Sequence, residues 1–233
     1  MMEKIHYELE DEIATIRMDD GKANAMDFAF FEQMDKAIDR LEGDNAKTLI
    51  LTGRPGYFSG GLDVKLMPSL SPTELNTFVE TLARTMLRVF TLALPTVAVC
   101  PGHTVAGGAI LAFSCDLRFI VEGPYRIQMN EMTIGIPLPS WMLLIGRCAI
   151  PVQWLAEALL HARAYSPTEA VERGIFHGLI KNGENVEAYG RDQSVNLKTL
   201  NMHAYATSKN RMRASEVKHV LELLKEELPF NKA

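Results

Sequence analysis

Two glycine-rich turns offer the clearest chemistry in this sequence. They are Phe58–Asp63 (FSGGLD) and Gly102–Gly108 (GHTVAGG), and each follows an apolar, strand-like run. Glycines let the backbone approach a ligand closely, and free amides at the start of a helix favour negative charge. Neither turn matches GxxxxGK[ST] or GxGxxG, so the common nucleotide-phosphate loops are disfavoured. Singly, each is most often a tight turn. Together they suit an oxyanion hole, in which two amides stabilise a carbonyl oxygen that becomes negative.

Other polar residues give weaker signals. His103 lies in the second glycine turn, where packing is more frequent than acid–base chemistry. Ser59 lacks the GxSxG context of a nucleophile elbow, and Asp116 is expected to satisfy backbone groups. We expect Asp63 to cap the turn that it begins. The six histidines are scattered and no HxxxH or CxxC spacing occurs, so no metal site is expected.

Alternating strand-like and helical segments must position these turns. Short apolar runs predict strands at Ile5–Leu9, Ile13–Met18, Thr48–Thr52, Thr96–Cys100, Leu117–Val121 and His177–Ile180. Helical spacing predicts a helix from Asp27 to Gly43, another over Ser71–Leu92, one from Gly107, and mostly helix after Pro137. The first glycine turn is predicted as a loop. The repeated strand–helix order predicts a layered α/β fold.

Composition narrows the class of protein. The 233 residues are 47% hydrophobic and 23% charged, which is typical of a globular domain and excludes disordered, collagenous and coiled-coil classes. A net charge of -5 without a basic stripe argues against a nucleic-acid partner. Apolar runs of about a dozen residues are shorter than the ~20 that a membrane span requires. One domain, or one with an extension, is therefore expected.

The three cysteines bear on the compartment. Cys100, Cys115 and Cys148 form an odd set without CxxC spacing, and each lies in an apolar stretch. Such cysteines are typically buried, reduced thiols, which favours a reducing compartment. The acidic start MMEKIHYELEDE lacks the order of a signal peptide. A cytoplasmic protein is therefore predicted.

Five segments in one order resemble the crotonases, the enoyl-CoA hydratase/isomerase superfamily. They are GKANAM, FSGGLDVKLM, PTVAVCPGHTVAGGAILAFSCDLRF, MNEMTIGIPLP and YSPTEAVERGIFHGLI. The resemblance implies an α/β spiral of ββα turns over 1–140, carrying an acyl-CoA site, and a mostly helical oligomerisation region over 141–233. It also implies an acyl-CoA thioester ligand, a homotrimer or hexamer, and no metal or cofactor beyond the coenzyme A of the substrate.

The resemblance also assigns site residues. It implies that the backbone N–H groups of Leu62 and Gly107 form the oxyanion hole. Lys22, Ala23 and Ala25 are expected beside the coenzyme A adenine and pantetheine. The full set of implied substrate-binding residues is Lys22, Ala23, Ala25, Gly61, Asp63, Val64, Lys65, Gly108 and Ile110. Lys22 and Lys65 are placed to meet phosphates, although any one surface lysine is more often simply solvated.

The acidic residues decide which reaction the resemblance implies. Hydratases of the family generally use two glutamates to hold and activate a water; here Glu131 fills the later position and Ile110 the earlier one. A single carboxylate suits isomerisation of a 3-enoyl thioester to the 2-trans form, and the pattern NE…IGIPLP…W looks like the 3,2-enoyl-CoA isomerases. Burial among Met129, Met132 and Ile134 would raise the pKa of Glu131 and strengthen it as a base.

Two alternatives stay open from the sequence. One is a hydratase or another crotonase reaction in which His103 or Glu80 supplies the second polar group. The other is a relative that binds acyl-CoA without catalysis. The tail, Pro229–Ala233, is short for the family, so the resemblance implies that the acyl pocket is covered by a different element or by a neighbouring subunit.

Overall fold

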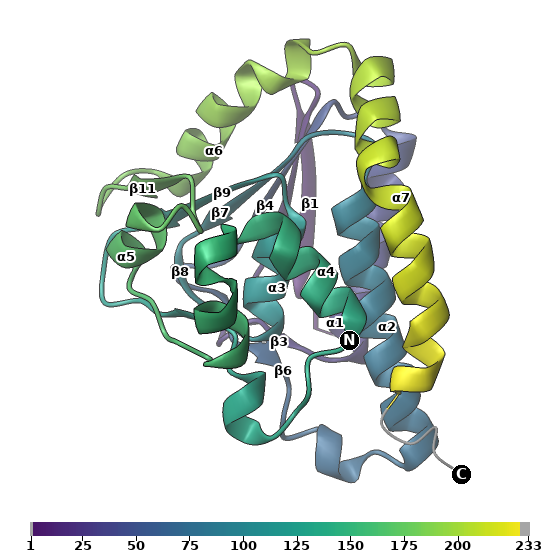
Figure 1. The fold of residues 1–233 in the computed structure, drawn as a ribbon. Helices are drawn as coiled ribbons and strands as arrows, with labels where there is room; N and C mark the ends of the chain where they lie inside the picture. Colours follow the sequence, from purple (N-terminus) through teal and green to yellow (C-terminus); the bar gives the residue numbers. More distant parts are fainter. Residues whose placement is uncertain (1, 229–233) are drawn as a thin grey trace.

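A parallel sheet forms the centre of the molecule in the computed structural model, which describes residues 2–228 (Figure 1). Its strand order is β1-β2-β4-β7-β9-β11. The predicted hairpin of β1 (Ile5–Glu10) and β2 (Ile13–Met18) is antiparallel. The strands that follow are parallel: β4 (Thr48–Thr52), β7 (Thr96–Cys100), β9 (Leu117–Val121) and β11 (Gly178–Ile180). Parallel strands need long crossovers, and these carry the rest of the fold.

Each crossover repeats one unit. The chain forms one or two short strands outside the main sheet and then a helix that leads back to it. The units are β3 (Ala25–Met26) with α1 (Phe28–Gly43), β5 (Gly56–Ser59) and β6 (Gly61–Leu62) with α2 (Pro72–Thr91), β8 (Gly102–Val105) with α3 (Gly107–Ser114), and β10 (Ile127–Gln128) with α4 (Ser140–Ala149). The short strands form a second sheet, β10-β8-β5, and a pair, β3-β6. The expected spiral of ββα turns is thus confirmed.

The glycine-rich turns contain strands where only loops were expected. Gly102 and Gly56 are paired in β8 and β5. A Cβ on Gly102 would lie 2.0 Å from the carbonyl oxygen of Gly56, so only glycine permits this approach. Period-two alternation could not reveal these strands, because residues without side chains carry no such pattern.

The C-terminal third is mostly helical, as predicted. It contains α4, α5 (Pro167–Glu172), α6 (Val186–Val195) and α7 (Met202–Glu227), with β11 returning to the main sheet. The stretch 152–160 is a 3-10 turn followed by a π-helical turn rather than an α-helix. Further 3-10 turns occupy Met67–Ser69, Glu131–Ile134 and Leu197–Thr199. The division of the chain at residue 140 stays a prediction, as does the oligomerisation role of residues 141–233. The tail, Pro229–Ala233, lies outside the described residues.

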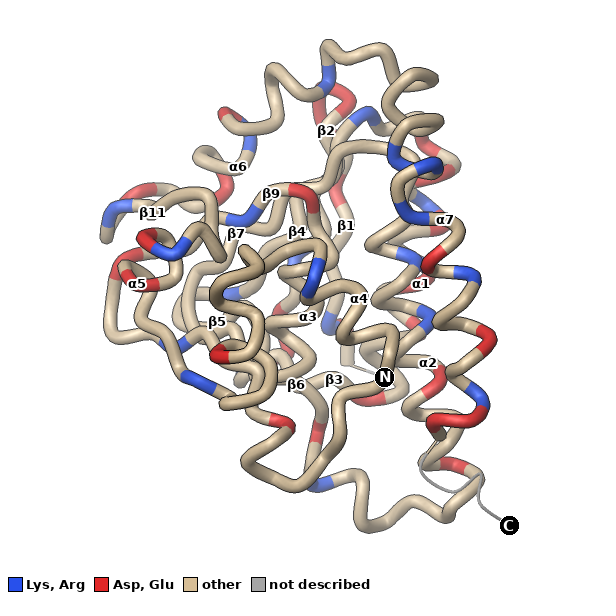
Figure 2. The backbone as a smooth tube through the Cα atoms, in the orientation of Figure 1, with Lys and Arg blue, Asp and Glu red and all other residues tan. Residues whose placement is uncertain are grey.

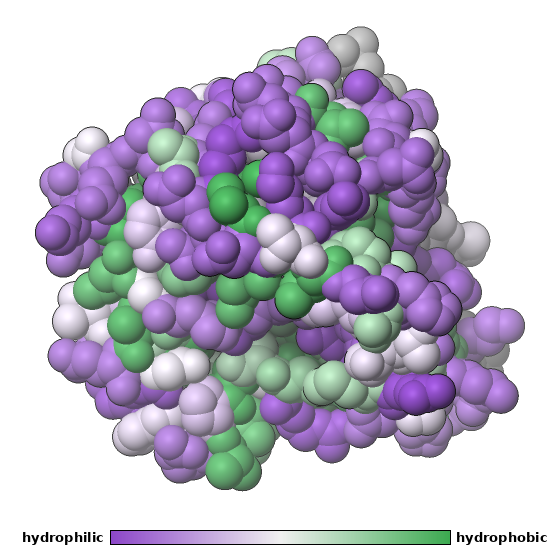
Figure 3. Space-filling model, turned by 90° about the horizontal axis from the view of Figure 1, so that it is seen from above, coloured by the Kyte–Doolittle hydropathy of each residue, from purple (hydrophilic) through white to green (hydrophobic). Residues whose placement is uncertain are grey.

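The main core lies between one face of the sheet and the helices α1 to α4 and α7, while α6 covers the other face. Acidic and basic residues alternate with other residues along α2 and α7 (Figure 2). From above, apolar surface is broken up by hydrophilic residues (Figure 3). Among residues 2–228, no helix is both long and apolar enough to cross a membrane. Cys100 and Cys115 are buried as expected, but Cys148 is exposed because it faces outward in the last turn of α4.

Candidate active site

The pairing of β8 with β10 brings Gly107 and Glu131 to the same end of the small sheet. The strands are parallel, with Val105 opposite Gln128, and the N–H of Ala106 donates to the carbonyl oxygen of Gln128 at 2.7 Å. Gly107 begins α3 two residues after Val105, and Glu131 begins a 3-10 turn three residues after Gln128. Both therefore emerge beyond the carboxyl ends of neighbouring strands, the edge at which ligands bind in many α/β proteins.

The backbones of the two glycine turns touch each other. A Cβ on Gly61 would lie 3.0 Å from the nitrogen of Gly107, and a Cβ on Gly107 would lie 3.7 Å from the nitrogen of Leu62. Gly61 has φ +89°, and Ala106 holds φ +51° immediately before α3. These positive φ values bend both chains at the point where they meet.

The backbone N–H groups of Leu62 and Gly107 are not used within their own strand pair or helix. Gly107 is the first residue of α3, so its N–H has no acceptor within that helix. The N–H of Asp63 donates to the carbonyl oxygen of Met26 in β3 at 3.0 Å. Because successive amides of a strand point to opposite sides, the N–H of Leu62 points away from β3. Each of the two turns therefore leaves one backbone N–H directed away from its own helix or strand pair.

Glu131 is a buried acid with no cation beside it. Only 6% of the residue is exposed, and its Oε2 has no hydrogen-bond partner among the described residues. Burial raises its pKa above the usual range, and its own backbone N–H opposes that shift. No charged side chain within residues 2–228 contributes to it. The predicted burial is confirmed, but the expected cover is partly wrong. Met129 is 3% exposed, whereas Ile134 is 53% exposed because its turn projects outward.

Comparison with known proteins assigns the chain to a family. Residues 8–228 match the family model described as enoyl-CoA hydratase/isomerase. The chain belongs to the enoyl-CoA hydratase/isomerase family. Mouse enoyl-CoA delta isomerase 1, mitochondrial, is 26% identical over 215 residues, which cover 90% of this chain and 73% of the relative.

Solved structures support the same assignment. A hydratase/isomerase family protein from Pseudomonas syringae superposes with a TM-score of 0.90 at 28% identity, covering 97% of each chain. Human mitochondrial delta3-delta2-enoyl-CoA isomerase superposes with a TM-score of 0.92 over 99% of this chain and 92% of its own. At 24% identity, the human structure supports the crotonase fold alone.

The segment that contains Lys22, Ala23 and Ala25 packs on the first glycine turn. The carbonyl oxygen of Ala23 accepts from the N–H of Gly60 at 2.8 Å, and Ala25 pairs with Gly61 in β3-β6. Lys22 is exposed, and its carbonyl oxygen accepts from the guanidinium of Arg54 at 2.8 Å. The structure thus brings together two segments that are about 35 residues apart and were both expected at the acyl-CoA site.

Asn24 and Ser59, which sequence reasoning did not assign to the site, hold these two segments in place. The Asn24 amide is 1% exposed and donates to the carbonyl oxygens of Met18 and Phe58 at 2.9 and 3.0 Å. The Ser59 hydroxyl donates to the carbonyl oxygen of Asn24 at 2.7 Å and accepts from the N–H of Gly61 at 3.1 Å. The only signal in the sequence was a polar residue, Asn24, between two alanines in GKANAM. In the structure Asn24 has φ +52°.

The remaining expected substrate residues flank the two amides. Asp63 accepts from the N–H of Lys65 at 3.0 Å, which confirms its predicted capping of the turn. Val64 is 59% exposed and Lys65 is exposed. Gly108 packs against Ser59, where a Cβ would lie 2.4 Å from the carbonyl oxygen, and Ile110 is fully buried in α3.

The structure gives the alternative polar residues other partners. His103 lies between the rings of Tyr57 and Tyr125, and its Nδ1 accepts from the N–H of Arg126 at 3.1 Å. Glu80 pairs with Arg84 one helical turn along α2, at 2.7 Å. Asp116 accepts from the N–H of Thr96, as predicted for a backbone-satisfying residue. None of these side chains contributes to the pKa shift of Glu131.

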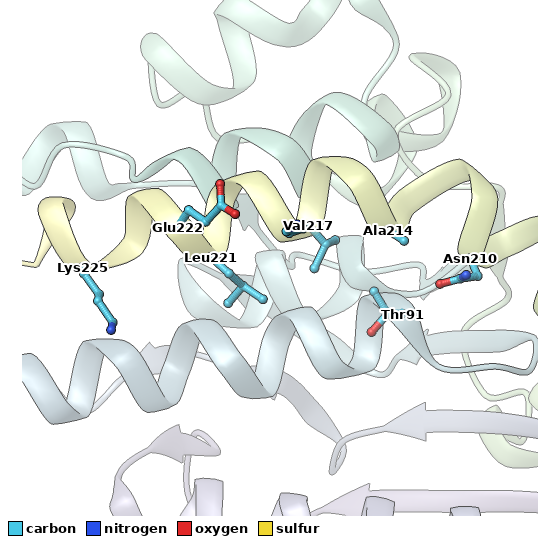
Figure 4. Close-up of a pocket in the computed structure, with 8 residues that line it drawn as sticks. Thr91, Asn210, Ala214, Val217, Leu221, Glu222 and Lys225 are labelled. Atoms are coloured by element: carbon cyan, nitrogen blue, oxygen red, sulfur yellow. The ribbon is translucent and has the colours of Figure 1, made fainter.

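A large groove lies away from these residues. It has a volume of about 710 Å³ and runs between α2 and α7, with Thr91 at one end and Leu221 and Val217 facing α2 (Figure 4). None of its lining residues is among those expected at the acyl-CoA site. Within residues 2–228, no group of three or more His, Cys, Asp or Glu side chains is placed to hold a metal ion.

Proposed function

We propose that this family member is a 3,2-enoyl-CoA isomerase that uses Glu131 as its single acid–base group. The observation that carries the proposal is the isolation of this buried carboxylate. A second carboxylate close enough to share a water would raise the pKa of Glu131 by charge repulsion, and no charged side chain acts on it. The position expected for that partner is the buried, apolar Ile110.

The proposed reaction is a proton transfer across three carbons. The Glu131 carboxylate takes a proton from C2, and the C–H electron pair moves into the C1–C2 bond while the carbonyl π pair moves onto the thioester oxygen. That oxygen accepts hydrogen bonds from the N–H groups of Leu62 and Gly107. The carboxylic acid returns the proton to C4, where the C3–C4 π pair forms the new C–H bond. The C1–C2 π pair shifts to C2–C3, the pair on oxygen re-forms the carbonyl, and the carboxylate is regenerated. No proton is gained or lost overall.

The two packed segments suit an extended thioester ligand. Gly60, Gly61 and Ala23 present backbone rather than bulky side chains, so a pantetheine arm can approach closely. Lys22 and Lys65 are exposed on these two segments, where they can pair with the phosphates of coenzyme A. We assign no metal or redox cofactor to the reaction, because a carboxylate and two amides supply every proton and charge contact that it needs.

The experiment compares two substrates with the purified protein. We expect 3-enoyl-CoA to be converted to 2-trans-enoyl-CoA and little water to be added to 2-enoyl-CoA. Glu131→Gln keeps the shape and loses the basicity, so turnover falls by about 10²–10⁴-fold while coenzyme A ester binding stays within a few-fold. Glu80→Gln, which changes a carboxylate paired with Arg84, is the matched control and leaves turnover unchanged.

Other outcomes identify the alternatives. Hydration without isomerisation assigns the chain to the hydratases of the family and requires a second polar group in the site. Tight binding of acyl-CoA with no turnover of any enoyl isomer assigns it a binding role. The homotrimer or hexamer and the cytoplasmic location stay proposals that sedimentation and fractionation test; the mouse relative is described as mitochondrial.

A further inference from the structure

Three buried polar atoms without partners fall within one short stretch of the chain. They are Oδ1 of Asn130, Oε2 of Glu131 and Nε1 of Trp141. Trp141 is the largest fully buried side chain of the described residues. Buried polar atoms are hydrogen-bonded in the great majority of cases, so three orphaned atoms in twelve residues need an explanation.

Trp141 and Gly107 are equally far along their helices from a contact that joins the two helices. The Arg118 guanidinium donates to the carbonyl oxygens of Cys115 and Ala149 at 2.8 and 3.2 Å, which ties together the ends of α3 and α4. Gly107 and Trp141 each precede their tied carbonyl by eight residues, or about 12 Å of helix. The two helices also pack against each other between these points.

Glu131 follows β10, which pairs with β8, the strand that leads into Gly107. The indole Nε1–H is a donor only, whereas the Asn130 and Glu131 oxygens are acceptors. One donor and two acceptors are what a single ordered water satisfies, because it accepts one hydrogen bond and donates two. A buried water typically makes about three such bonds.

We infer that Trp141 is a positioning residue that holds Oε2 of Glu131 through one water shared with Asn130. The contact itself does not depend on the reaction, but its catalytic meaning rests on the proposed isomerase. Fixing Oε2 orients the other carboxylate oxygen toward the substrate. The same bond stabilises the ionised form of Glu131, so it limits how far burial alone raises the pKa.

Tryptophan fluorescence tests the contact without any assay of turnover. The chain has two tryptophans, Trp141 and Trp154. Trp154 stacks on Arg173 away from the proposed contact, so Trp154→Phe leaves Trp141 as the single emitter. We expect its emission to titrate with one transition above the usual range of a glutamate, and Glu131→Gln to abolish that transition.

A second ionisable group beside Trp141 requires a control. Glu227 of α7 accepts from the N–H of Ser140 at 2.8 Å, next to Trp141 in α4. In the Trp154→Phe background, Glu227→Gln should keep the transition that Glu131→Gln removes. A flat titration, or one that persists in Glu131→Gln, overturns the inference.

Trp141→Phe tests the catalytic consequence, because it keeps the aromatic ring and deletes the donor. Without the indole donor the water is no longer held against the carboxylate, so the ionised form loses a hydrogen bond. We expect the acid limb of the pH–rate profile to move up by about one unit, with KM unchanged. An unmoved acid limb overturns the positioning role even if kcat falls. If the fluorescence titration behaves as expected but no isomerase activity exists, the proposed function fails while the contact stands.

Discussion

At the scale of single residues, the burial of Glu131 affects both its basicity and the stability of the fold. Burial raises its pKa, which makes the ionised carboxylate a stronger base, and no cation compensates the charge. The same burial makes ionisation costly in the folded protein. Catalytic strength and folding stability are therefore opposed at this residue.

We predict that Glu131→Gln stabilises the protein at pH 7 but not at pH 4. The folded-state pKa is raised, so the stability that Glu131 contributes is complete below its unfolded pKa of about 4.3 and is lost as pH rises through the folded pKa. Denaturant midpoints of both proteins at the two pH values check this. Glu32→Gln, at a 53% exposed side chain, should change stability by less than about 0.5 kcal/mol at either pH. Equal midpoints at pH 7 contradict the prediction.

A second acid at position 110 should weaken the isomerase. Ile110 is fully buried in α3, at the position where the resemblance expects a partner for Glu131. In Ile110→Glu, charge repulsion raises the pKa of Glu131 further, so the acid limb of the pH–rate profile moves to higher pH. Ile110→Gln introduces the same size without charge and should leave that limb in place. A limb that moves equally in both variants would show that only packing was disturbed.

The resemblance implies roles for Glu131, Leu62 and Gly107, but it does not imply which residues hold them in place. Asn24 and Ser59 act on backbone atoms about 35 residues away, and such contacts leave no periodic pattern in the sequence. The burial of Glu131 was predicted for a partly wrong reason, because Ile134 lies outside the core. Ile134 lies at the far end of the 3-10 turn that Glu131 begins, so its closeness in sequence did not make it a core neighbour of Glu131.

At the scale of elements, the two amides depend on how closely α3 approaches β5. Gly108 marks this contact, since a Cβ there would lie 2.4 Å from the carbonyl oxygen and 2.8 Å from Cβ of Ser59. The predicted strands of the main sheet were confirmed because they are short apolar runs, and the helices that cover it because their apolar residues repeat at helical spacing. The small sheet was missed because glycine contacts, not side-chain patterns, set its geometry.

Gly108→Ala should therefore destabilise the fold and also displace the backbone N–H groups of Leu62 and Gly107. The added methyl group has backbone on its far side, so α3 must move, at a cost of about 1–3 kcal/mol. Gly43→Ala, at the end of α1 with nothing within 4 Å, is the matched control and should be neutral or slightly stabilising. Urea denaturation and the kcat of isomerisation check both variants. Unchanged stability in Gly108→Ala would mean that α3 and β5 are not in close contact.

At the scale of the whole molecule, one acid connects the last helix to the central sheet. Asp116, just before β9, accepts hydrogen bonds from Tyr205, Lys209 and Arg213 of α7 at 2.9, 2.7 and 2.9 Å. It also accepts from the N–H of Thr96 at the start of β7. The cluster joins segments that are about 90 residues apart, so α7 is fixed to the core by charge as well as by apolar packing.

Asp116→Asn should remove much of the stabilisation that this cluster gives to the packing of α7. Burial opposes ionisation of Asp116, but Lys209 and Arg213 outweigh it and hold the pKa below its usual value. A lowered folded pKa means that the contribution is present above the unfolded pKa of about 3.9 and is lost as pH falls through the folded value. Removing one partner of a buried pair costs about 3–5 kcal/mol.

The measurement is the free energy of unfolding at pH 7 and pH 3. The wild type should lose stability between these values more steeply than Asp116→Asn, whose amide cannot titrate. Asp39→Asn breaks an ion pair of similar length, 2.6 Å to Arg88, but its side chain is 67% exposed. Because exposed pairs are screened by water, this control should cost no more than about 1 kcal/mol. Asp116→Asn leaves the cations of Lys209 and Arg213 uncompensated in the core, whereas Asp39→Asn leaves Arg88 in contact with water. Similar losses in the two variants would therefore show that α7 is held by its apolar face alone.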